Sequence, residues 1–147
     1  MPALSSFDYA VVRVVPRVER QESINAGVIL FCLERDFLQA RVEVDESRLR
    51  ALWPGTDVDL VRQHLEAIPR ICAGSPEGGP IARLSLRERF HWLVAPRSAS
   101  IQTSKVHTGR CDSLARQLDH LMQTMVRVPA RPSPRPGAPD APAPTPD

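Results

Sequence analysis

Residues 24–44 read INAGVILFCLERDFLQARVEV, and this stretch decides the fold. Its centre, Val28 to Leu33, is continuously apolar, which is typical of a strand buried on both faces of a sheet. Glu34 to Asp36 is short enough for a hairpin connection. From Phe37 to Val44 apolar and polar residues alternate, which predicts a strand with one face in water. The stretch therefore predicts an antiparallel pair of strands whose first member is covered on both sides.

Three other segments have the composition of strands. The run FDYAVVRVVPRV at residues 7–18 is rich in branched side chains, and Pro16 either ends that strand or places it at an edge, because proline has no amide hydrogen to donate. We also predict strands at residues 90–95 and 100–107. The connection at residues 96–98 is short enough to join antiparallel neighbours.

Two segments between the strands have helical periodicity. Asp45 is an expected N-cap for a short helix, and a longer helix opens at Thr56 or Asp57. Pro69 is expected to kink or end the longer helix at Ile68, because it removes a backbone hydrogen bond. Apolar residues three and four apart form one stripe along this helix, namely Val58, Val61, Leu65, Ile68 and Cys72.

Two more helical signals come later in the chain. Ser85 and Glu88 fit a capping box, which we interpret as a single helical turn. Asp112 or Ser113 is the expected cap of a final helix. Its apolar face carries Leu114, Leu118, Leu121, Met122 and Met125.

The end of the sequence has a different composition. From Pro129 to Asp147, eight of nineteen residues are proline and none is Ile, Leu, Phe or Val. Such a segment buries too little apolar surface to offset its conformational entropy, so we expect disorder. Grouped strands and helices, without strict alternation, favour an α+β fold. We expect a mostly antiparallel sheet of about five strands packed against two main helices in one domain, residues 7–128, followed by a disordered Pro-rich C-terminal tail, residues 129–147.

Composition argues against several classes of protein. The net charge of +2 is too small for general coating of nucleic acid. The N-terminus lacks the pattern of a signal peptide, and no window reaches the ~18 apolar residues of a membrane span. Cys32, Cys72 and Cys111 do not form a disulfide framework or a zinc ribbon. We expect a cytoplasmic protein. The sequence has no phosphate-loop, metalloprotease or serine-hydrolase motif, and we expect no metal and no cofactor.

The chain resembles a known bacterial family, the domain of unknown function 3037, over about residues 7–127. Five segments carry the resemblance: RVVPRVER (13–20), NAGVILFC (25–32), FHWLVAPRS (90–98), IQTS (101–104) and HTG (107–109). The resemblance implies no activity and no catalytic residues. It implies a partner, because relatives are often encoded beside a HipA-like kinase-fold protein.

A first polar cluster lies at the end of the first predicted strand. Arg13 and Arg17 are four residues apart, so on a regular strand they face the same way. Together with Asn25 they are candidates for binding carboxylates or phosphates. Pairing of these arginines with Glu19, Glu22 or Glu43 within the chain is the alternative.

A second polar cluster precedes the last predicted helix. Thr108 and Gly109 lead toward a helix N-terminus, where exposed amides and the helix dipole favour an anion. Arg97, Ser104 and His107 complete this candidate anion or ligand site. Cys111 lacks a partner residue that would orient it for nucleophilic chemistry, so we expect it to be structural.

The leading functional hypothesis is a cytosolic binding or regulatory module, with a HipA-like kinase-fold protein as the partner that the resemblance suggests. The alternative is a metal-independent enzyme acting on phosphodiesters or nucleotides. In that alternative His91 and His107 carry protons, and Arg97 or Lys105 stabilises the developing charge. Nucleic acid stays open as a partner if Trp92 is exposed for stacking on RNA bases.

Overall fold

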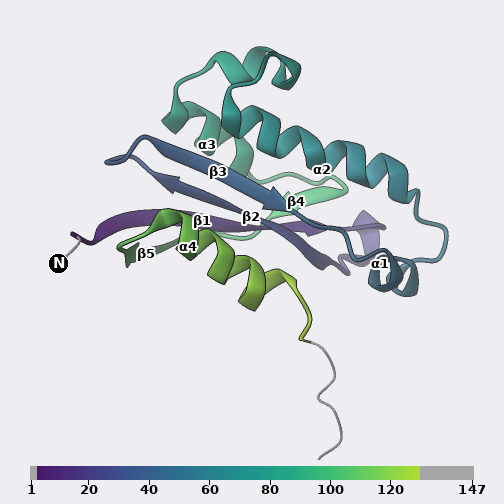
Figure 1. Cartoon of the computed structure of the whole chain (residues 1–147). Helices are drawn as coiled ribbons and strands as arrows, with labels where there is room; N and C mark the ends of the chain where they lie inside the picture. Colours follow the sequence, from purple (N-terminus) through teal and green to yellow (C-terminus); the bar gives the residue numbers. More distant parts are fainter. Residues whose placement is uncertain (1–2, 130–147) are drawn as a thin grey trace, which may run out of the picture.

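The computed structural model describes residues 3–129, which form one sheet with helices on both of its faces (Figure 1). The strands are β1 (Ser5–Val14), β2 (Ile24–Cys32), β3 (Phe37–Val42), β4 (Ile101–Thr103) and β5 (His107–Cys111). The α-helices are α1 (Glu46–Leu52), α2 (Val58–Ala73), α3 (Leu86–Val94) and α4 (Leu114–Leu121). The fold is therefore α+β, as the sequence predicts.

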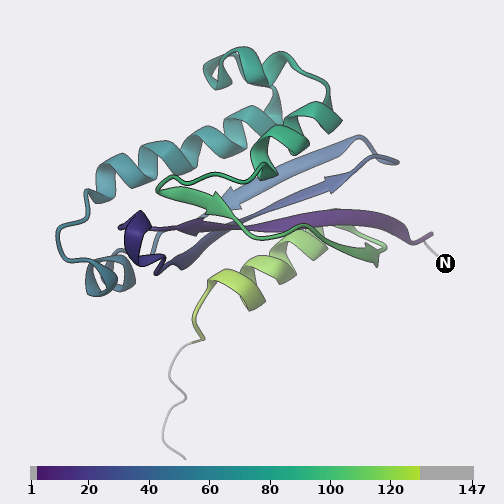
Figure 2. The same cartoon turned by 180° about the vertical axis from the view of Figure 1, so that it is seen from behind.

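All strand pairs in the sheet are antiparallel. The order is β3-β2-β1-β4, and β5 pairs with β1 on the same side as β4. Val12 lies opposite Thr103 in β4, and Tyr9 lies opposite His107 in β5. β4 and β5 are thus two halves of one interrupted edge strand beside β1 (Figure 2).

The helices divide between the two faces of the sheet (Figures 1 and 2). On one face α2 and α3 cover a core that includes Ile29 and Phe31 of β2. On the other face α4 covers a core that includes Val28 and Leu30. Successive side chains of a strand point to opposite faces, so β2 contributes to both cores, which confirms its prediction as a strand buried on both sides.

The two helices after β3 begin where the sequence predicts. Asp45 accepts a hydrogen bond from the Arg48 amide, and Asp57 caps α2 in the same way. The predicted apolar stripe of α2 is buried. The expectation that Pro69 ends α2 is wrong, because the helix continues to Ala73. Ile71 and Cys72 beyond the proline pack into the core, and this burial offsets the single lost hydrogen bond.

The predicted strand at residues 90–95 is also wrong, because these residues belong to α3. The capping box at Ser85 and Glu88 is present, but the helix that it starts continues for nine residues. Phe90 and Leu93 are buried on its inner side, three residues apart as on one face of a helix. The predicted strand at residues 100–107 is divided into β4 and β5, so the sheet still contains five strands.

The last helix is capped by Ser113, whose hydroxyl accepts from the Arg116 amide, and Asp112 lies outside it. α4 passes into a π-helical turn, Met122–Val126. Its apolar face is buried except for Met125. The predicted disordered tail lies outside the described residues apart from Pro129. No helix within residues 3–129 is both long and apolar enough to cross a membrane.

Candidate functional site

Two adjoining hollows run along α2 on the helix-rich side of the sheet. One has a volume of about 250 Å³ and lies at the N-terminal end of α2. The other, of about 100 Å³, lies between α2, the end of α3 and β4. His64 lines both hollows, so they adjoin, and we call the two together the tryptophan groove. Its main residues are Arg17, Trp53, His64, Trp92, Arg97 and Ile101.

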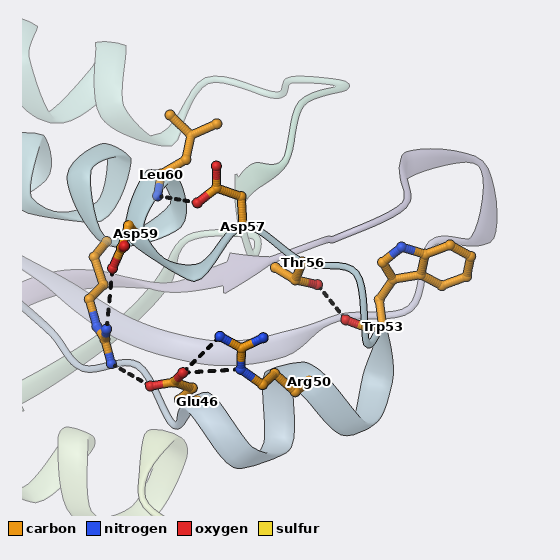
Figure 3. A network of polar contacts seen from close by, with 8 residues as sticks. Glu46, Arg50, Trp53, Thr56, Asp57, Asp59 and Leu60 are labelled. Carbon is orange, nitrogen blue, oxygen red and sulfur yellow. Dashed lines mark hydrogen bonds and ion pairs between the residues drawn. The ribbon is translucent and has the colours of Figure 1, made fainter.

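The first end of the groove is built around Trp53, which follows the last turn of α1 (Figure 3). The Trp53 amide donates to the Leu49 carbonyl, and the Thr56 hydroxyl donates to the Trp53 carbonyl at 2.6 Å. Arg17 lies over the indole at 4.9 Å from guanidinium carbon to ring centroid, and Arg20 lies at 5.9 Å. The Trp53 backbone is therefore held at both its amide and its carbonyl, and two guanidinium groups lie over the indole ring.

Ion pairs connect α1 to α2 behind this end of the groove (Figure 3). Glu46 accepts from Arg50 at 3.0 Å and from Arg62 at 3.2 Å. Hydrogen bonds from these two guanidiniums lower the pKa of Glu46 from its ordinary value. The three side chains are exposed, so they contribute to the relative position of the helices more than to stability.

The second end of the groove is built around Trp92 in the last turn of α3. The indole is 39% exposed. Arg97 lies 4.2 Å from its ring centroid and also donates to the Trp92 carbonyl. The Thr103 hydroxyl donates to the Val94 carbonyl at 3.4 Å, which joins β4 to the end of α3.

Apolar side chains form the floor of the hollow at the Trp92 end. Ile68 and Ile71 come from α2, Leu93 from α3 and Ile101 from β4. β4 is an edge strand, with no further strand on its outer side within residues 3–129. The groove thus combines an apolar floor with an aromatic ring and an arginine at each end, which suits an extended segment that carries apolar and acidic groups.

The predicted cluster of Arg13, Arg17 and Asn25 is divided. β1 ends at Val14, so Arg17 lies beyond the strand and the expectation that it faces the same way as Arg13 is wrong. Arg17 lines the groove and pairs with Glu19 at 2.6 Å, which is the alternative of internal pairing.

Arg13 and Asn25 lie on the opposite side of the sheet. They are cross-strand partners, so they share a face. The Asn25 amide donates to the Met125 carbonyl at 2.9 Å, which places both residues on the α4 side. Asn25 therefore anchors the end of the last helix.

Ser104 and Gly109 have structural contacts that account for them. The Ser104 hydroxyl is buried, accepts from the Val11 amide at 2.9 Å and donates to the Lys105 carbonyl at 2.9 Å. The hydroxyl thus supplies a hydrogen-bond acceptor for the Val11 amide of β1 at the point where the edge strand is interrupted. A Cβ at Gly109 would lie 2.5 Å from Cζ of Phe7, so glycine allows the Phe7 ring to pack on β5.

His107 and Thr108 are exposed on β5 and not on a loop that enters a helix. The ring of His107 lies 5.3 Å from that of Tyr9, which packs against the α4-side core. The Arg35 guanidinium donates to the Asp112 carbonyl at 2.8 Å, between β5 and α4. Among the predicted site residues, only Arg17 and Arg97 line the tryptophan groove.

The sheet separates the two histidines of the enzymatic alternative. His91 belongs to α3, on the α2 side, whereas His107 faces the α4 side with Tyr9. These imidazoles do not open onto one cleft. Cys111 is buried, and burial raises the pKa of its thiol, which opposes a reactive thiolate. Within residues 3–129 no group of three or more His, Cys, Asp or Glu side chains is placed to hold a metal ion.

Trp53 and His64 line the groove but are absent from the residues that the sequence suggests. Trp53 has the pattern of an apolar helix residue, and His64 lies on the polar side of the α2 stripe. Their proximity to Arg17 and β4 depends on contacts between segments far apart in the chain. The scarcity of tryptophan, two in 147 residues, is a signal for Trp53. The sequence offers no such signal for His64.

The fold defines an α+β protein whose five-stranded antiparallel sheet carries helices on both faces. The chain belongs to the family described as protein of unknown function (DUF3037), whose sequence model matches residues 9–126. The match confirms the resemblance seen in the sequence. Neither a curated protein nor a solved structure matches the chain. Function is therefore inferred from the chemistry of the groove.

Proposed function

We propose that this protein is a binding module that captures an extended segment of a partner protein in the tryptophan groove. One observation carries the proposal: the chain has two tryptophans, and each lines one of the two adjoining hollows of the groove, with an arginine over its ring. Tryptophan and arginine are the residues most enriched among those that dominate binding energy at protein interfaces.

The groove supports binding more than chemistry. Its floor is apolar, and its two arginines, Arg17 and Arg97, stay charged and do not serve as proton carriers near neutral pH. His64 is the one imidazole among the groove residues. A partner segment with apolar side chains on the floor and carboxylates near Arg97 would match this surface.

The partner to test first is the HipA-like kinase-fold protein that the family resemblance suggests. The experiment is co-expression of the two proteins and co-purification through a tag on the partner. We expect the double variant Trp92→Ala with Arg97→Ala to lose the chain from the complex, since it removes one end of the groove.

The matched control is Arg116→Ala, which removes an exposed arginine from α4 on the opposite side of the sheet. It should co-purify like the unchanged chain. Equal recovery of the groove variant and the control would contradict the proposed binding surface. Absence of any complex with the unchanged chain would show that the suggested partner is wrong.

A further inference from the structure

We propose that residues 136–142 of this same chain dock into the tryptophan groove and compete with the partner segment. The proposal rests on the proposed function, because it assigns a second occupant to the same groove. The tail segment would then reduce the affinity of the groove for the partner segment. Four observations support it, from the sequence of the tail, the length of the groove, the point where the tail begins and the charges.

The tail sequence has the periodicity of a polyproline II ligand. Residues 136–142 read PGAPDAP, with Pro136, Pro139 and Pro142 three positions apart. A polyproline II helix has three residues per turn, so these prolines would lie along one edge. Grooves lined by aromatic rings are the surfaces that recognise such segments, and this conformation costs little entropy to order.

The length of the groove matches that of the segment. The groove follows α2 from Asp57 to Ile71, a distance on the order of 20 Å at the rise of an α-helix. Seven residues in polyproline II conformation also extend on the order of 20 Å. Residues 136–142 are therefore long enough to reach from Trp53 to Trp92.

The tail begins roughly one length of α1 away from the Trp53 end of the groove. Val128 lines a hollow with Asp45, at the N-terminus of α1, and Trp53 follows the other end of that helix. Figure 1 shows that α4 runs toward the end of the sheet where α1 lies. The length of α1 is roughly 10 Å, and the eight residues from Pro129 to Pro136 span roughly 20 Å when extended. The chain can therefore pass along α1 and enter the groove at Trp53.

The charges at the Arg97 end agree with this direction of entry. At the Trp53 end, Arg17 and Arg20 already pair with Glu19 and Glu22. At the far end, Arg97 donates to a neutral carbonyl. A segment that enters at Trp53 would place Asp140, the acidic residue of PGAPDAP, near Arg97. The ring of Trp92 would then contact the neighbouring prolines.

Tethering makes weak docking sufficient. A segment joined by a short flexible connection has an effective concentration on the order of 1 mM at its site. If the untethered segment binds with a dissociation constant of tens of micromolar, the tethered segment would then occupy the groove in most molecules. A partner would bind more weakly, because only the fraction of molecules with an empty groove could accept it.

The test measures how accessible Trp92 is to acrylamide in the full chain with Trp53→Phe, where Trp92 is the only tryptophan. Replacing Pro136, Pro139 and Pro142 by serine should raise the quenching constant about twofold, because the tail then leaves the indole. The matched control replaces the same number of prolines outside the period of three: Pro132, Pro134 and Pro144. The same comparison in the chain that retains both tryptophans gives a second readout that does not depend on the Trp53→Phe variant folding.

The proposal requires a rise in the first tail variant, no rise in the control, and no dependence on protein concentration. Equal quenching in all chains would overturn it, as would an equal rise in the control. Protection that increases with protein concentration would also overturn it, because the groove would then hold the tail of a second copy. The co-purification experiment with Trp92 and Arg97 judges the proposed function separately, so the two can fail independently.

Discussion

The two faces of the sheet are covered in different ways. On one face α4 and its π-helical turn pack closely, with the Phe7 ring against Gly109 and the Asn25 amide bonded to the Met125 carbonyl. On the other face α2 and α3 cover the core but leave a groove beside β4. On the α4 side the Asn25 amide and the Arg35 guanidinium have partners within the chain, whereas the α2 side presents two indole rings with arginines over them.

This difference indicates which polar residues support the fold and which are available for binding. Ser104 and Asn25 belong to the first kind, because their polar groups already have partners in the chain. Arg97 and Trp92 belong to the second, because the pair stacks at the surface. The predictions below test this division.

The largest expected effect is on stability and is the same for both faces. Leu65 of α2 and Leu118 of α4 are almost completely buried, each in the core of its own face. Leu65→Ala and Leu118→Ala should each reduce the free energy of unfolding by about 3 kcal/mol, through lost apolar contact and the cavity left behind. Urea unfolding followed by circular dichroism measures both. A negligible loss for Leu118→Ala would mean that α4 is not an integral layer.

A smaller effect is confined to the α4 side. Gly109→Ala places a methyl group against the Phe7 ring and should cost about 2 kcal/mol, since the ring has to move within a packed core. The control is Gly55→Ala, where the nearest atom to a new Cβ is 3.6 Å away. Thermal unfolding of the two variants compares them directly. Equal midpoints would show that Phe7 does not pack on Gly109 as described.

The next effect lies at the interruption between β4 and β5. Ser104→Ala leaves the buried Val11 amide without its acceptor, which should cost about 1–2 kcal/mol. Hydrogen exchange at the Val11 amide should become faster. Thr108→Ala removes an exposed hydroxyl on β5 and serves as the control. Unchanged exchange at Val11 in the Ser104 variant would contradict a structural role for this hydroxyl.

The smallest effect concerns the ion pairs behind the groove. Arg50 and Arg62 hold the pKa of Glu46 below its ordinary value of 4.5 in the folded chain. The stabilisation from these pairs is therefore present above pH 4.5 and is lost as the pH falls through the lowered folded value. The unchanged chain should therefore be more stable than Glu46→Gln above pH 4.5, and this difference should shrink in acid. Urea unfolding midpoints of the two chains, measured as a function of pH, test this. A constant difference between the two chains at every pH would contradict the pairing.

The sequence predicted the elements whose signals are local. The alternation in β3, the caps Asp45 and Asp57 and the stripe of α2 depend only on residues near one another in the chain. For the α3 segment the sequence predicts a strand, because Phe90, Trp92 and Val94 favour strands by composition. The capping box and the helical spacing of buried residues were present in the same segment and outweighed that preference.

Less of the candidate site could be predicted. Arg17 and Arg97 were chosen for their chemistry, and both lie in the groove. Trp53 and His64 reach it only through contacts between α1, α2 and β4, which no local pattern encodes. The sequence suggests Ser104 and Gly109 as ligand residues. It does not show that the Ser104 hydroxyl accepts from the Val11 amide, or that the Phe7 ring packs on Gly109.

The most direct test of the central claim is hydrogen–deuterium exchange of the full chain with and without the HipA-like protein that we propose as its partner. We predict slower exchange in the peptides that contain Trp53 to His64 and Trp92 to Thr103, the walls of the tryptophan groove. Protection confined to β5 and α4, with these peptides unchanged, would contradict the account.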